Sequence, residues 1–438
     1  MSIQFAFKLT LAYISKFRRV VFVSLLFGVL IFTSINIFLP YFSSLRNFRI
    51  GVIGKYKTND LPINIQGQIT RGITKIGEDG TPLPDLAESW DVRDEAKTWV
   101  FNLASGIVWH DKTRLNSQNV LYEFEDVIIE TPQENQIIFK LKESYSPFPS
   151  VLAKPVFRKG LIGTGDWQVD KISLVSDYVE KLTLVNKAKE KKTYKFYPST
   201  ENAKLAFKLG EVDEIHNLFD PAPFDKWTSV DLTSDVNKNQ VVTLFFNTES
   251  ASFTEKSFRQ ALAYAIDKDK FGDRAVGPIS PLSWAYNPQV KPYTYDTERA
   301  GELLGTLPEN SSGQVEINLV TPSTLLKVAE QIAKDWEAVG IKVHIQVSSI
   351  IPEDFQVYLT IYDIPSDPDQ YPIWHSTQKG TNISRFASPR IDKILEDGRV
   401  ETDIEERKKI YLDFQRFLLE DVPAIFLYHP TYYSVARR

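Results

Sequence analysis

The chain has 438 residues, 43% hydrophobic and 24% charged, which is enough for a sizeable core and, by length, for two or three domains. Its net charge is −5 and its basic residues are scattered, so no nucleic-acid partner is expected. The absence of cysteine excludes disulfides, thiolate metal sites, a cysteine nucleophile and a lipid-modified N-terminal cysteine.

An apolar run near the N-terminus predicts a membrane anchor. Residues 20–39 contain no charged side chain, and at about 1.5 Å per residue such a helix just crosses a hydrocarbon core of about 30 Å. The basic residues that precede it favour a cytoplasmic N-terminus, with the rest of the chain outside; they are Lys8, Lys16, Arg18 and Arg19. A cleaved signal peptide is the first alternative, but the run is longer than a typical apolar signal region and no small-residue cleavage site follows it. A buried soluble helix is the second alternative.

The remainder of the chain is predicted to be mixed α/β. Alternating apolar residues indicate short strands at 48–53, 98–103 and 136–141. Residues 315–319 and 341–347 also alternate, and they flank a helical pattern over 325–336 that Gly340 ends. Strand, helix and strand in this order predict a parallel pair with a right-handed crossover.

Two further helices are predicted in the second half. Thr254 is a candidate N-cap for a helix with Phe258 and Leu262 on its apolar face. Thr402 and Glu405 have the spacing of a capping box before a helix that buries apolar residues on one face. Residues 424–428 then read as a closing strand.

Local motifs give no support to an enzyme. The five histidines show no metal-binding spacing, and His344 falls on the solvent side of a predicted strand. The sequence also lacks a P-loop, a dinucleotide loop and the GxSxG elbow of hydrolases. We therefore expect no cofactor, no bound metal and no catalytic residue.

One segment, residues 362–377, is dense in chemical groups. Its aspartates lie among prolines and close to aromatic side chains; the residues are Asp363, Asp367, Asp369, Tyr371, Trp374 and His375. Carboxylates beside aromatic rings hold a cationic group while the rings cover apolar parts of a ligand. A solvated Asp-Pro turn with a packed tryptophan, or a hard-metal site from the three aspartates, are the alternatives that the residues leave open.

Six elements, in order over about residues 48–436, resemble the peptide-binding class of solute-binding proteins of bacterial ABC importers, a family that also includes dipeptide, oligopeptide and nickel binders. The most specific is Leu-Phe-Phe-Asn-Thr at 244–248 followed by Phe-Arg-Gln-Ala-Leu-Ala-Tyr-Ala-Ile-Asp at 258–267. The others lie at 83–90, at 98–111, at 163–165, at 210–213, and at 363–368 with Asn382 and 388–392.

The resemblance implies a two-lobed, periplasmic-binding-protein-like (class II) α/β fold with a small extra domain, here after one N-terminal transmembrane helix. The expected segments, in chain order, are a cytoplasmic basic segment (1–19), the anchor (20–39), a spacer with the first strand of lobe I (40–71), the extra domain (72–154), lobe I (155–245), lobe II (246–423) and a return to lobe I (424–438). The lobes are expected to hinge at 244–248 and 424–428.

The resemblance also implies ligand contacts. Asp363 best matches the aspartate that pairs with a peptide's α-amino group. Because the segment has one additional residue, Asp367 and Asp369 are alternatives. Tyr371, Trp374 and His375 are expected to line the cleft, and Asn382 to hold the loop or reach the ligand. The region after Asn119 is shorter than usual in the family, which leaves pocket depth and ligand length open.

The sequence thus predicts a single-pass, extracytoplasmic, monomeric binding protein that delivers a small ligand, most simply a peptide, to ABC permease subunits. The alternatives are a non-peptide solute or metal chelate in the same fold, an envelope sensor or scaffold, and a membrane-tethered hydrolase.

Overall fold

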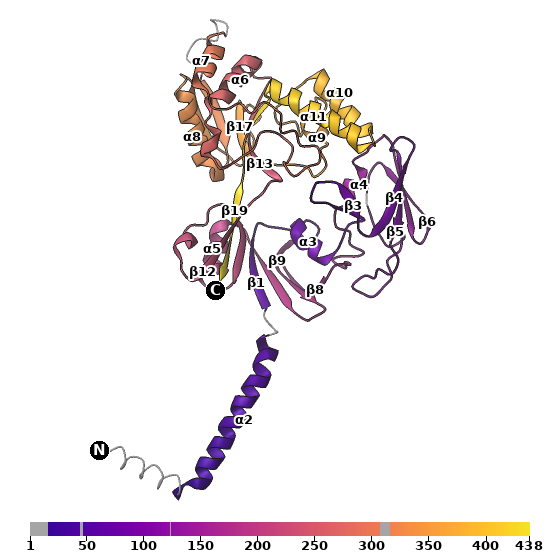
Figure 1. Cartoon of the computed structure of the whole chain (residues 1–438), viewed down its shortest axis with the longest axis vertical. Coiled ribbons are helices and arrows are strands. Elements are labelled where there is room, and N and C mark those ends of the chain that lie inside the picture. Colours follow the sequence, from indigo (N-terminus) through magenta and orange to yellow (C-terminus); the bar gives the residue numbers. More distant parts are fainter. Residues whose placement is uncertain (1–15, 44–46, 123, 307–315) are drawn as a thin grey trace, which may run out of the picture.

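The computed structural model describes residues 16–43, 47–122, 124–306 and 316–438 (Figure 1). Helix α2 (Arg18–Ser43) precedes the folded body. Most of the expected basic segment 1–19, and residues 44–46 of the expected spacer within 40–71, lie outside the described residues. Among the residues that are described, no helix combines the length and apolar content of a membrane span, and the anchor at 20–39 stays a prediction.

Lobe I is built on a seven-stranded sheet in the order β12-β19-β11-β1-β10-β9-β8. β1 pairs in parallel with β10 and β11, whereas the other neighbours are antiparallel. Helices α3 (Ile63–Ile69) and α5 (Thr200–Lys208) pack on this sheet. The strands are β1 (Asn47–Ile53), β8 (Trp167–Val175), β9 (Tyr178–Asn186), β10 (Lys191–Tyr197), β11 (Glu214–Leu218), β12 (Val230–Val236) and β19 (Thr431–Arg437).

Lobe II is built on a six-stranded sheet in the order β14-β18-β13-β17-β15-β16. Its strands are β13 (Gln240–Phe246), β14 (Asp273–Arg274), β15 (Glu316–Thr321), β16 (Lys342–Val347), β17 (Val357–Asp363) and β18 (Ala424–His429). Its helices are α6 (Lys256–Ala265), α7 (Thr297–Gly305), α8 (Leu326–Glu337), α9 (Tyr371–Trp374), α10 (Pro389–Val400) and α11 (Ile404–Asp421).

The helices of lobe II cover both faces of this sheet, as β13 shows. Leu244 packs with Trp336 of α8 in one core cluster, whereas Phe245 packs with Phe414 of α11 in another. Both strand residues are fully buried. A strand covered on both faces reads as a continuous apolar run, which is why β13 shows no alternation.

The small extra domain contains a four-stranded antiparallel sheet in the order β4-β5-β7-β6. Before it lies the hairpin of β2 (Thr74–Ile76) and β3 (Pro82–Pro84), and after it the short helix α4 (Phe148–Val151). An aromatic core that includes Trp99 and Phe139 holds the domain together. The sheet strands are β4 (Ala87–Arg93), β5 (Thr98–Leu103), β6 (Val127–Gln133) and β7 (Gln136–Leu141).

The predicted strand-helix-strand unit is confirmed, because β15 and β16 pair in parallel with α8 between them in the chain. Gly340 follows α8 with a φ of +87°, a conformation that a Cβ disfavours. Exposed His344 bonds to Glu316 on the neighbouring strand.

Both capping predictions are wrong. Glu255 is the N-cap of α6 without a side-chain bond, and the Thr254 hydroxyl donates to Ala251 O instead. At α11 the cap is Asp403, whose Oδ1 accepts the N–H groups of Glu405 and Glu406. An Asp one residue after a Thr competes for the same role, and sequence spacing does not decide between them.

The chain crosses between the lobes at residues 237–239 and at Pro430. The Asn237 amide donates to the Pro430 carbonyl at 2.9 Å, so the two crossings lie together. The expected lobe boundaries at 245/246 and 423/424 therefore fall within or next to strands of the lobe II sheet, and the segments expected to hinge, 244–248 and 424–428, overlap the same strands. β13 and β18 lie entirely within the lobe II sheet, since the cores on both sides of that sheet need their side chains.

Candidate functional site

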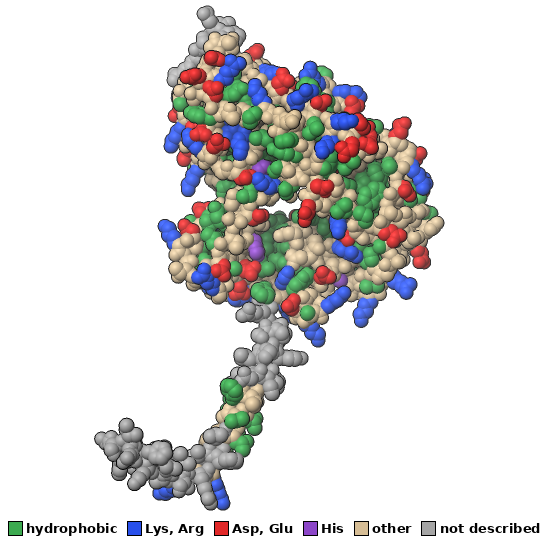
Figure 2. Space-filling view, in the orientation of Figure 1, with side chains coloured by type: hydrophobic (Ala, Val, Ile, Leu, Met, Phe, Trp, Pro, Cys, Tyr) green, Lys and Arg blue, Asp and Glu red, His purple; other side chains and the backbone are tan. Residues whose placement is uncertain are grey.

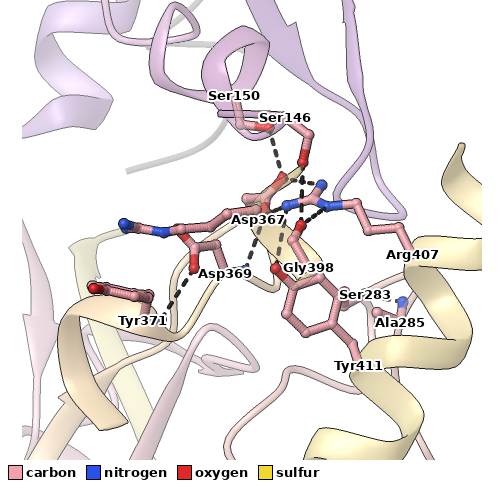
Figure 3. Close-up of polar contacts among 11 residues, drawn as sticks. Ser146, Ser150, Ser283, Ala285, Asp367, Asp369, Tyr371, Gly398, Arg407 and Tyr411 are labelled. Atoms are coloured by element: carbon pink, nitrogen blue, oxygen red, sulfur yellow. Dashed lines mark hydrogen bonds and ion pairs between the residues drawn. The ribbon is translucent and has the colours of Figure 1, made fainter. Parts of the chain in front are cut away.

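Asp367 is held by a buried ion pair. Arg407 Nη1 and Nη2 donate to the two carboxylate oxygens at 2.9 and 2.6 Å, and the side chains are 8% (Arg407) and 10% (Asp367) exposed. Figure 3 shows this pair beside Ser150 of the extra domain, whose hydroxyl lies 3.4 Å from Asp367 Oδ2. A fork-to-fork pair of this kind occupies the carboxylate, so Asp367 anchors its loop.

Asp369 is occupied in a similar way. Its Oδ2 accepts Arg399 Nε at 3.0 Å and its Oδ1 accepts the Tyr371 N–H at 3.1 Å. Burial raises the pKa of Asp369, although Arg399 opposes the shift. The Arg399 guanidinium also lies 3.8 Å from the centre of the Tyr371 ring and so covers one face of that ring.

Trp374, His375 and Asn382 belong to the interior of lobe II. Trp374 is fully buried, and its Nε1 donates to Gln370 Oε1 at 3.0 Å. His375 is 4% exposed and stacks on Tyr371 with ring centres 3.9 Å apart. The Asn382 side chain forms hydrogen bonds with the backbone N and O of Phe386. These bonds correspond to the first of its two predicted roles, in which it holds the loop.

Asp363, the last residue of β17, is exposed beside the crossing strands. Its Oδ1 accepts Gln240 Nε2 at 2.6 Å, and Gln240 Oε1 accepts the Tyr432 hydroxyl at 2.7 Å. Burial, and then the charge of Asp363, raise the pKa of Tyr432. Because Tyr432 belongs to lobe I, this chain of bonds joins the two lobes.

A cavity of about 540 Å³ lies where the extra domain, the first crossing and lobe II meet. Figure 2 shows the surface hollowed between the upper and lower parts of the molecule. The volume of the cavity is within the range of small-molecule sites. The lining residues are Ile76, Gly77, Glu78 and Gly80 of the β2–β3 turn, Asn239 of the crossing, Ser280, Leu282 and Ser283, and Pro365 and Ser366 after β17.

None of the seven predicted residues is among these described lining residues, although Pro365 and Ser366 come from the predicted segment. The other lining residues come from three stretches distant in sequence. Glycines at 77 and 80 indicate a turn, but nothing local shows what the turn faces. In the described part of the chain, no group of three or more His, Asp or Glu side chains is arranged to hold a metal ion.

Two lobes on separate sheets, two crossing segments and a cavity beside them with both polar and apolar lining residues define the class of two-lobed solute-binding proteins. The family described as bacterial extracellular solute-binding proteins, family 5, middle region, matches residues 81–382, and the chain belongs to this family.

Individual relatives are similar over most of their length. The oligopeptide-binding protein AppA of Bacillus subtilis (strain 168) is 24% identical over 456 residues, covering 86% of this chain and 83% of that protein. The dipeptide-binding protein of Escherichia coli (strain K12) is 24% identical over 454 residues, covering 81% and 82%. The crystal structure of NikZ from Campylobacter jejuni in complex with Ni(L-His) superposes with a TM-score of 0.73 at 21% identity, covering 90% and 94%.

Proposed function

We propose that the protein captures a small peptide in the cavity where the extra domain, the first crossing and lobe II meet, and delivers it to the permease of an ABC importer. The observation that carries this proposal is the cavity lining. The lining of this cavity of about 540 Å³ combines three serines, one asparagine and one glutamate with apolar residues, and none of the described lining side chains is cationic. Such a lining suits a ligand with many polar groups and a positive charge. Relatives named as oligopeptide- and dipeptide-binding proteins support the same ligand class.

Within the predicted segment, Asp363 is the carboxylate that we propose as a ligand contact. Asp367 and Asp369 are each paired with a buried or half-buried arginine, whereas Asp363 is exposed and bonded to a neutral amide. Its position beside the crossing strands would let a bound ligand influence the link from Gln240 to Tyr432 and hence the lobes.

Calorimetric titration of the detergent-purified full chain with alanine peptides of two to five residues tests the function. We expect saturable binding of at least one of them. Native mass spectrometry of the freshly purified protein is the complementary measurement, since it identifies any ligand that co-purifies. A co-purified metal chelate or sugar, with no peptide binding, would replace the peptide by another solute class.

We also propose that residues 20–39 anchor the protein in the membrane with the lobes outside. The run is uncharged, and the described side chains Val23, Phe27, Leu30 and Phe32 are all more than half exposed. Apolar helices of this kind are stable when lipid covers them. The intact mass of membrane-extracted protein should include these residues; a mature N-terminus after residue 39 would show a cleaved signal instead.

A further inference from the structure

The turn between β2 and β3 is held by its own hydrogen bonds. Gly77 N donates to Thr81 O at 2.7 Å, and Gly80 N donates to Gly77 O at 3.0 Å. Asp79 Oδ1 accepts both the N–H and the hydroxyl of Thr81, so this carboxylate turns back into the hairpin. The neighbouring Glu78 lines the cavity instead.

Lobe II fixes the position of this turn. The Trp284 amide donates to Asp79 O at 2.7 Å. Gly80 has a φ of +82°, and a Cβ there would lie 3.1 Å from the Ser366 carbonyl oxygen, so both the backbone conformation and the close approach favour glycine. Glu78 is therefore presented to the cavity from a turn that is docked against the residues lining the opposite side.

The charge of Glu78 has no described counterpart. Among the described residues that line the cavity, Glu78 is the one with a charged side chain. Within the described residues, no hydrogen bond or ion pair reaches its carboxylate, in contrast to the carboxylates of Asp363, Asp367 and Asp369.

We propose that the Glu78 carboxylate binds the positively charged group of the ligand, a primary ammonium such as the N-terminus of a peptide. This rests on the proposed function and adds the residue that selects a cationic ligand. A ligand entering the cavity loses water around its ammonium, and a charge-assisted bond to a carboxylate offsets that cost. Because Glu78 belongs to the extra domain and the facing serines to lobe II, the ligand would bridge these two parts.

The test is calorimetric titration of the full chain and its Glu78→Gln variant with trialanine and N-acetyl-trialanine. We expect Glu78→Gln to weaken trialanine binding at least tenfold and to leave the weaker binding of the acetylated peptide unchanged. Glu88→Gln is the matched control, since Glu88 is an exposed carboxylate of β4 in the same domain but outside the cavity lining. Thermal unfolding of each variant confirms that the fold is retained.

The outcomes separate the two proposals. If trialanine and the other short alanine peptides fail to bind the unmodified chain, the proposed function and the Glu78 assignment are both overturned. If trialanine binds the unmodified chain and Glu78→Gln equally well, the assignment alone is overturned. If only Asp363→Asn removes the preference for the free over the acetylated N-terminus, the ammonium belongs to Asp363.

Discussion

At the scale of single residues, the ion pair between Asp367 and Arg407 gives Asp367 a structural role in the aspartate-rich segment. Replacing Arg407 by Met leaves a buried carboxylate without its counter-charge, and the same pair is broken by Asp367→Asn. Removing one partner of a buried ion pair typically costs about 3–5 kcal/mol. We expect losses of this size in the free energy of unfolding, measured by urea denaturation.

A control for this prediction lies on the same helix. Lys409 forms an exposed ion pair with Glu406, so Lys409→Met should change the stability by less than about 0.5 kcal/mol. An Asp367→Asn variant with unchanged stability but lost ligand binding would contradict the structural role and restore Asp367 as a ligand contact.

Lys268 is the residue whose titration should be visible in stability. Its ammonium donates to the carbonyls of Ala263, Ile266 and Tyr293, and burial lowers the pKa of Lys268 from 10.5 to about 7. Between these values the unfolded chain binds more protons than the folded chain, so this residue makes stability rise with pH, by at most about 1.4 kcal/mol per pH unit.

The contribution of Lys268 is isolated by comparison with Lys268→Met in urea denaturation at pH values of about 5, 6, 7.5 and 9.5, chosen on both sides of the lowered pKa. The stability difference should move in favour of the unmodified chain between pH 7.5 and 9.5 and stay constant below pH 7. A difference independent of pH over the whole range would show that Lys268 remains charged in the folded protein.

At the scale of elements, two neighbouring residues, Thr402 and Asp403, are candidates for the N-cap of α11. Asp403 accepts two backbone N–H groups at 3.0 Å, whereas the capping-box spacing had indicated Thr402. Asp403→Ala should lower the stability by about 1 kcal/mol, as loss of an N-cap does. Thr402→Ala, compared by the same denaturation experiment, should have little effect. Equal losses in the two variants would restore Thr402 as a partner in the cap.

At the scale of the whole molecule, we expect the lobes to rotate about the crossings at 237–239 and Pro430, because the chain passes between the two sheets there. The absence of cysteine allows spin labels at chosen pairs. Asp177 lies in the β8–β9 turn of lobe I and Lys393 in α10 of lobe II, and both are exposed. We expect short alanine peptides to shorten and narrow the distance distribution between labels at these positions, because burial of a ligand between lobes requires closure.

Labels at Lys334 and Lys393, both exposed on lobe II helices, provide the control, and their distance should not change. A distribution between Asp177 and Lys393 that saturating peptide leaves unaltered would indicate a rigid scaffold.

The sequence by itself determined two kinds of feature: local secondary structure, and motifs that the chain shares with its family. Alternation and helical spacing predicted the unit of β15, α8 and β16, since each pattern follows from one covered face. Six ordered motifs indicated the family, which the match over residues 81–382 confirms. The chemical density after β17 marked the segment from which Pro365 and Ser366 line the cavity, but none of the seven residues predicted as ligand contacts is among the described lining residues.

Only the tertiary structure decided which carboxylates are free. Asp367 pairs with Arg407 forty residues later, and Asp369 with Arg399, across contacts that no local spacing reveals. Glu78 is an exposed turn residue, and it lines the cavity because the hairpin docks on Trp284 and Ser366. Whether a carboxylate stays available to a ligand depends on the charges that folding brings within a few ångströms, and that proximity is a property of the packed chain.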